Sequence, residues 1–162
     1  MTTAAGTLRP AEPEDRDAII ALIDDCLREI GDRVCLEGEG KDLLDVRTSY
    51  DECGGAFVVL ESGGEVIGTH ATLPIDDERG AATFRRLYLK KSHRGSGHGA
   101  RLMEWAIDWC REHGFVKIVF WSDTNFTRAH RLFESFGFTR GETRDMNDGA
   151  VPYSEYCFSR KL

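Results

Sequence analysis

Apolar residues recur at regular spacing along the chain, and this spacing predicts the secondary structure. Residues 7–9 form a short strand-like segment before a proline. Residues 13–31 begin with a proline and two acids, continue with apolar residues at helical spacing, and end at a glycine. These features predict a helix with a favourable first turn and a glycine stop. Residues 32–55 contain only a short helical pattern.

The rest of the chain predicts two further helices, near residues 97–113 and 127–136. A glycine pair at residues 63–64 joins the first two of six further strands as a hairpin. We place these strands at Ala56–Leu60, Val66–Leu73, Ala81–Lys90, Val116–Trp121, Phe138–Thr143 and Tyr153–Ser159. This order predicts an α/β protein of the α+β type with a mixed sheet. No repeat or linker divides it, so we expect one domain over residues 1–162.

The composition, with 41% apolar and 30% charged residues, is typical of a soluble globular protein. No apolar run approaches the ~20 residues of a membrane span, and the first ten residues lack the apolar core of a signal peptide. We therefore expect a cytoplasmic protein that does not bind membranes. Its five cysteines include no Cys-x-x-Cys pair, so we expect reduced thiols and no metal site.

The net charge of −7 argues against a nucleic-acid-binding protein, but the charges are unevenly distributed. No acid lies between Arg79 and Met103. That stretch holds seven basic residues, namely Arg79, Arg85, Arg86, Lys90, Lys91, Arg94 and Arg101. A basic segment in an acidic protein indicates a local anion-binding site.

The centre of that basic segment is a glycine-rich loop, Arg94-Gly95-Ser96-Gly97-His98-Gly99, which comes directly before a predicted helix. Backbone amides of such a loop and of the helix N-terminus can bind phosphate oxygens. Gly95-x-Gly97-x-x-Ala100 fits a dinucleotide-binding fingerprint, and an aspartate, Asp123, follows the next strand. However, the strand before the loop is studded with charge, whereas a dinucleotide fold requires a strand buried on both faces.

The same loop also reads as Arg94-x-x-Gly97-x-Gly99, and in this form it resembles the pyrophosphate signature of the GCN5-related N-acetyltransferase (GNAT) family. Residues 129–138, Ala-His-Arg-Leu-Phe-Glu-Ser-Phe-Gly-Phe, resemble a second motif of that family. The resemblance implies the GNAT fold, with a mostly antiparallel sheet of six to seven strands and about four helices. It also implies acetyl-CoA as the donor and an amine of a small molecule or peptide as the acceptor, with direct transfer between them.

The resemblance further implies where the cofactor binds. The fourth and fifth strands would separate to admit it, and Lys90, Lys91 and Arg101 would serve its 3′-phosphate. The implied cofactor-binding residues are Leu87, Tyr88, Leu89, Arg94, Gly95, Ser96, Gly97, His98, Gly99, Ala100 and Asn125.

The chemical end of the site departs from the family pattern. Phe133 replaces the family's proton-donating tyrosine, and Thr83 stands near the position of its glutamate base. We therefore consider three substitutes: His70 as a base, because imidazole titrates near neutrality, and Tyr88 and Tyr153 as acids. Thiolate departure can also proceed without an acid, because a free thiol has a pKa of about 8.5.

The acceptor and the assembly are less well specified. An acidic segment, consisting of Glu37, Glu39, Asp42, Asp45, Asp51 and Glu52, would attract a cationic amine. A homodimer is left open, as is an acyl group longer than acetyl. Because of the departures at Phe133 and Thr83, a second hypothesis is a module that senses acetyl-CoA with little or no catalysis.

Overall fold

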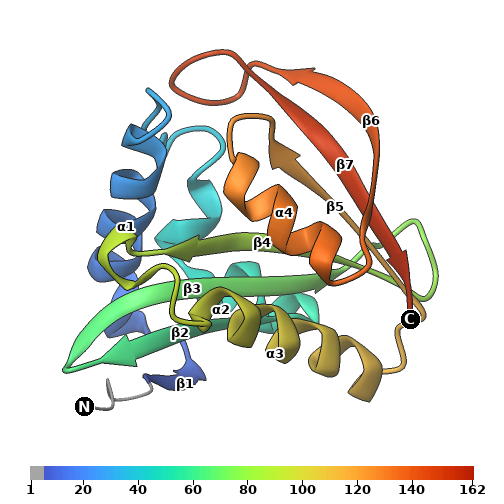
Figure 1. Cartoon of the computed structure of the whole chain (residues 1–162). Helices are drawn as coiled ribbons and strands as arrows, with labels where there is room; N and C mark the ends of the chain where they lie inside the picture. Colours follow the sequence, from blue (N-terminus) through green and yellow to red (C-terminus); the bar gives the residue numbers. More distant parts are fainter. Residues whose placement is uncertain (1–5) are drawn as a thin grey trace.

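A computed structural model describes residues 6–162, and their strands form a single seven-stranded sheet (Figure 1). The order across the sheet is β1-β2-β3-β4-β5-β7-β6. The strands are β1 Thr7–Pro10, β2 Ala56–Ser62, β3 Glu65–Pro74, β4 Ala81–Leu89, β5 Lys117–Asp123, β6 Thr139–Met146 and β7 Tyr153–Lys161. Only β4 and β5 pair in parallel; every other neighbouring pair is antiparallel.

The parallel pair β4–β5 is joined over a very short length. Its register contains only Ala81 opposite Lys117 and Ala82 opposite Ile118. Beyond these residues β4 continues to pair with β3, and β5 with β7. Figure 1 shows β4 and β5 together at one end and spread apart at the other. The separation predicted from the family resemblance is therefore present.

A β-bulge interrupts β4 where the two strands separate. The register moves from Thr69 opposite Tyr88 to Ala71 opposite Arg85, so that two residues of β4 face His70. Arg86, inside the bulge, has a φ of +60°, and it is the one non-glycine residue with positive φ among residues 6–162. Such a backbone costs about 1–2 kcal/mol, so the contacts of Arg86 must stabilise the bulge.

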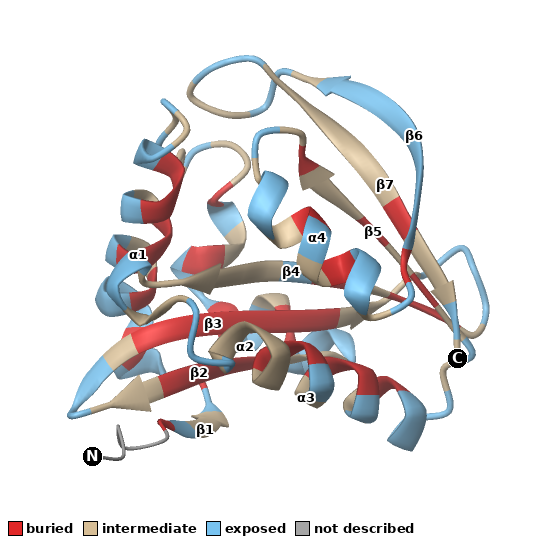
Figure 2. Ribbon diagram, in the orientation of Figure 1, coloured by how far each residue is buried: buried red, intermediate tan, exposed pale blue. Residues whose placement is uncertain are grey.

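Helices cover both faces of the sheet. Helix α1 (Arg16–Arg28) and α2 (Val46–Ser49) pack with β2 and β3 through a core that includes Ile23, Val46 and Phe57. Helices α3 (His98–Glu112) and α4 (Thr127–Ser135) pack on the other core, around Ile118 and Phe158. Figure 2 shows the buried sides of α1 and α3 against the buried strand β3, whereas β6 is exposed along its length.

The predicted α+β architecture is confirmed, with all strands and the longer helices within a few residues of their expected bounds. The difference lies in residues 32–55, where one short helix was expected. The structure instead contains α2 between two 3₁₀ turns, Lys41–Leu44 and Asp51–Cys53. The short turns change the direction of the chain several times, and Leu43, Val46 and Tyr50 are thereby buried in the core. None of the helices in residues 6–162 is long and apolar enough to span a membrane.

Candidate active site

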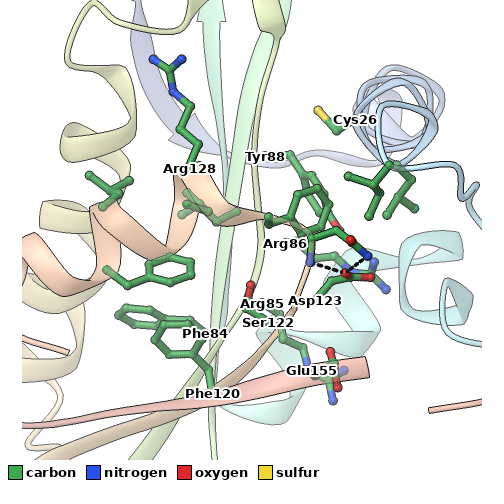
Figure 3. Close-up of a pocket in the computed structure, with 18 of the residues that line it drawn as sticks. Cys26, Phe84, Arg85, Arg86, Tyr88, Phe120, Ser122, Asp123, Arg128 and Glu155 are labelled. Atoms are coloured by element: carbon green, nitrogen blue, oxygen red, sulfur yellow. Dashed lines mark hydrogen bonds between the residues drawn. The ribbon is translucent and has the colours of Figure 1, made fainter. Parts of the chain in front are cut away.

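A cleft of about 790 Å³ opens where β4 and β5 separate. It extends from the glycine loop, past the diverging strands, to the start of β7. Figure 3 shows Phe84 and Phe120 side by side in its wall, with Tyr88, Arg86 and Asp123 further along. The apolar side chains that line the middle of the cleft include Phe84, Leu87, Phe120, Ala129, Leu132 and Phe133. One end is thus a backbone loop, the middle is apolar, and the far end is rich in charged groups.

The glycine loop forms the first end of the cleft. Gly95 and Gly97 have φ values of +84° and +86°, in the left-handed region that favours glycine. Gly97 is also the N-cap of α3, whose first amides have no acceptor within the helix. Four of the predicted cofactor residues line the cleft here, namely Gly95, Gly97, Gly99 and Ala100, whereas Ser96 and His98 are not among the lining residues. The loop therefore presents bare backbone, not side chains, to a ligand.

Arg94 lines the cleft, but its guanidinium is held by α1. Its Nη1 and Nη2 donate to the two carboxylate oxygens of Glu29 at 2.7 and 2.8 Å, and its Nε donates to the carbonyl of Leu89 at 3.0 Å. Arg94 thereby lowers the pKa of Glu29. In this arrangement Arg94 joins the loop to α1 and to the end of β4, while it still lines the cleft beside the loop, as a predicted cofactor-binding residue would.

Other cations expected at the phosphates also have protein partners. Lys90 bonds to Glu65, and Arg101 donates to the carbonyl of Gly6. Arg128, at the start of α4, was not predicted, but its Nη2 lies 3.7 Å from the place a Cβ of Gly95 would occupy. It is exposed and lines the cleft (Figure 3). Arg128 is thus a cation beside the loop with no hydrogen bond to residues 6–162, a position that only the fold reveals.

The middle of the cleft is the free edge of β4. Leu87, Tyr88 and Leu89 line it, as predicted, and beyond Ala82 no strand of the described residues pairs with this edge. Unpaired backbone groups of an edge strand can bond to an extended ligand. Tyr88 is partly buried, its ring 5.9 Å from that of Phe126, and burial raises the pKa of Tyr88 to about 12.

A buried ion network sits beneath the bulge of β4. Arg86 donates from Nε and Nη2 to the two oxygens of Asp42 at 3.0 and 2.5 Å, and from Nη1 to Glu39 at 3.2 Å. Tyr50 also donates to Asp42. Burial alone would raise the pKa of Asp42, but the ion pair with Arg86 outweighs it and lowers that pKa. Glu39 and Asp42, two acids of the segment that was expected to attract a cationic amine, are therefore bound to Arg86 and stabilise the fold.

His70, the predicted base, has no accessible surface. Its Nδ1 lies 3.1 Å from the carbonyl of Leu102, its Nε2 has no partner, and its ring packs 4.9 Å from that of Phe84. Burial lowers its pKa to about 4. His70 is one of the residues that border the cleft, but its side chain has no accessible surface with which to meet an amine. The β-strand pattern could not reveal this, because either face of β3 is covered by a helix.

The other predicted residues lie at the charged end of the cleft. Tyr153 lines the cleft and donates to Asp148 at 2.5 Å, and both burial and this bond raise the pKa of Tyr153. Asn125 lines it as well, but its backbone N–H and its side-chain Nδ2 are occupied by Oδ1 of Asp123, at 2.8 and 3.0 Å. The structure thus brings Tyr88, Tyr153 and Asn125 to one cleft, and His70 borders that cleft as a fully buried side chain.

Asp123 is the residue at this end whose role the sequence did not indicate. It is the last residue of β5 and is 9% exposed. Its Oδ1 accepts the two bonds from Asn125 (dashed in Figure 3), while its Oδ2 accepts none from residues 6–162. The sequence did contain a signal for this residue, because an aspartate follows an apolar strand. That aspartate was interpreted only as part of a dinucleotide-binding pattern. Within the part of the chain described, no group of three metal-ligating side chains occurs.

Residues 18–138 match the sequence model of the acetyltransferase (GNAT) family. The chain belongs to this family. Rat N-acetyltransferase family 8 member 2 is 31% identical over 109 residues, which are 65% of this chain and 47% of that protein. Human N-acetyltransferase 8B is 33% identical over 104 residues, 61% of this chain and 45% of its own. The chain thus spans about half the length of the curated GNAT relatives it matches.

Solved GNAT structures share the fold. A GNAT acetyltransferase from Staphylococcus aureus Mu50 superposes with a TM-score of 0.84 at 17% identity, covering 98% of this chain and 99% of that one. A phosphinothricin acetyltransferase from Sinorhizobium meliloti, crystallised with acetyl-CoA, superposes with a TM-score of 0.75 at 20% identity, covering 98% and 89%. The dinucleotide-binding alternative is therefore excluded, and the glycine loop is that of a GNAT fold.

Proposed function

We propose that this protein transfers an acetyl group from acetyl-CoA to an amine. The observation that carries the proposal is the separation of β4 and β5 directly beside a bare glycine loop at the N-terminus of α3. A phosphate-binding loop, an open strand edge and an apolar channel follow one another along a single cleft. That order suits a pyrophosphate, an amide-containing arm and a thioester.

The residues present fit acetyl-CoA at its phosphate end. The amides at Gly95–Ala100 and the guanidinium of Arg128 would hold the pyrophosphate. Arg128 is close enough to share it, because its Nη2 lies 3.7 Å from the position that a Cβ of Gly95 would occupy. The free edge of β4 at Leu87–Leu89 would bond to the arm. Curated relatives are named N-acetyltransferases, and one similar structure contains acetyl-CoA. Both facts support the same donor.

Asp123 and Tyr88 are the proposed proton-handling groups. The attacking amine must lose a proton, and the free Oδ2 of Asp123 can accept one, directly or through water. Tyr88 approaches the same part of the cleft from β4 (Figure 3), and its raised pKa keeps it protonated at neutral pH. It can therefore donate a hydrogen bond to the departing thiolate. Tyr153 is the further candidate donor, while Phe133 has no proton to give.

Two measurements test this function. Calorimetry should show acetyl-CoA binding to the purified protein, and thiol release should rise with a suitable amine from a panel. Asp123→Asn should lower kcat about 10²- to 10⁴-fold, in the range of general base catalysis, and leave the Kd for acetyl-CoA unchanged. Asn keeps an oxygen for the Asn125 bonds, so the fold is preserved. Absence of acetyl-CoA binding would refute the proposal; binding without turnover on any amine would favour a sensor.

A further inference from the structure

The charged end of the cleft contains one cation, Arg85, that no acid among residues 6–162 binds. Arg85, on β4 immediately before the bulge, is exposed and lines the cleft. Its backbone is part of the β3–β4 ladder, but its side chain makes no hydrogen bond and no ion pair within residues 6–162. Figure 3 shows it in the same part of the cleft as Asp123 and Ser122. Arg85 therefore lies in the same part of the cleft as Asp123, the proposed base.

Within the described residues, Asp123 keeps one free oxygen, Oδ2, and does not bond to Arg85, whereas the other acids near Arg85 are bound to other groups. Glu39 and Asp42 both bond to Arg86, and Asp42 also accepts from Tyr50. Further along, the acids of the β6–β7 end are likewise engaged: Asp148 accepts from Tyr153, and Glu155 accepts from Nε and Nη2 of Arg144 at 2.9 and 2.8 Å. Asp42 lies close enough to feel the charge of Arg85, but both of its oxygens are taken.

The second cation at this end, Arg144, is held differently. It is fixed by Glu155 and lies over the ring of Trp121, with its guanidinium carbon 4.1 Å from the ring centre. Arg144 is therefore neutralised and stacked, whereas Arg85 keeps its five donors open. A free guanidinium in a cleft matches the two oxygens of a carboxylate.

We infer that the acceptor is an amine that carries a carboxylate close to its amino group, as an amino acid does, and that Arg85 binds this carboxylate. The inference rests on the proposed function and specifies its substrate class. Asp123 favours approach of the ammonium form, and Arg85 binds the anionic group beside it. Two opposite charges in one part of the cleft suit a zwitterion better than a polyamine, which would place a cation against Arg85.

Matched acceptor pairs test the inference. Thiol release from acetyl-CoA is measured with each of the common amino acids and with its carboxamide, which removes the anionic charge and little else. The wild-type protein should prefer acids over amides in kcat/KM. Arg85→Gln should raise KM for the preferred acid about 10- to 100-fold, the range for losing a hydrogen bond to a charged group, and should leave KM for its amide and for acetyl-CoA unchanged. Arg111→Gln, at an exposed site on α3 outside the cleft lining, is the matched control.

Several results would overturn the inference. Amides that react as well as acids would do so, and so would an Arg85→Gln variant that loses the same factor with both. Binding gives a readout that does not need turnover: with CoA present, the acid should bind more tightly than its amide in calorimetry, and equal affinity or no binding of either rejects carboxylate recognition. Failure of the proposed function is distinguishable, because acetyl-CoA itself would then not bind.

Discussion

The burial of His70 gives a pH dependence of stability that can be worked out from the structure. The pKa of His70 is lowered to about 4 because its ring is fully buried, whereas an unfolded chain holds a histidine at about 6.5. Below pH 6.5 the unfolded chain therefore binds a proton that the folded protein does not. Stability from this group is fully present above pH 6.5 and is lost as the pH falls towards 4.

The size of this loss follows from linkage. Between pH 7 and pH 4.5 the difference in proton binding amounts to about 2–3 kcal/mol of unfolding free energy. Other groups titrate in the same range, so the measurement compares wild type with His70→Leu, which cannot take up the proton. Leu also removes Nε2, a buried nitrogen without a hydrogen-bond partner, from the core. Such a buried polar atom lowers the free energy of unfolding by about 1–3 kcal/mol.

Urea unfolding followed by circular dichroism at the two pH values provides the assay. The free energy of unfolding of wild type should fall by about 2–3 kcal/mol more than that of His70→Leu. An equal pH dependence in the two proteins would refute the reasoning, and would mean that His70 is solvated or protonated in the fold. Turnover gives a second check. Because His70 is fully buried, His70→Leu should keep the rise in kcat between pH 6 and 9 that wild type shows. Loss of that rise in the variant would identify His70 as the base.

Three further substitutions test the cleft. Arg86→Met leaves two partnered acids beneath the bulge without their cation and should cost about 3–5 kcal/mol in urea unfolding; a cost below about 1 kcal/mol, typical of an exposed pair, would contradict a buried network. Gly97→Ala should lower the free energy of unfolding by about 1 kcal/mol, because Gly97 has a φ of +86°. The control Gly63→Ala, in the hairpin at φ +58°, should lower it by about the same amount. Only Gly97→Ala should weaken acetyl-CoA binding in calorimetry. Glu29→Gln releases Arg94 and removes an acid beside the loop, so acetyl-CoA should bind up to about five-fold more tightly; weaker binding would show that the ion pair positions the loop.

The local pattern of the chain was sufficient for most of the architecture. Apolar spacing located the strands and the longer helices, because each buries one face and its period appears in the sequence. Residues 94–99 were recognisable as a phosphate loop for a related reason: Gly95 and Gly97 take positive φ and cannot be replaced without strain, and they lie two positions apart in the sequence. The fold family and the glycine loop could therefore be recognised from contiguous residues.

What the tertiary structure alone decided is which charges remain available. Arg94 and Arg85 look alike in the sequence, yet Glu29, 65 positions away, binds the first, and no acid in residues 6–162 binds the second. Glu39 and Asp42 look like surface acids, but Arg86, more than 40 positions later, draws them inward. Ion pairing and burial depend on contacts between distant segments, and these set both the accessible groups and their pKa values. The sequence by itself therefore determined the fold and the position of the glycine loop, whereas the identity of the free charged groups along the cleft required the folded chain.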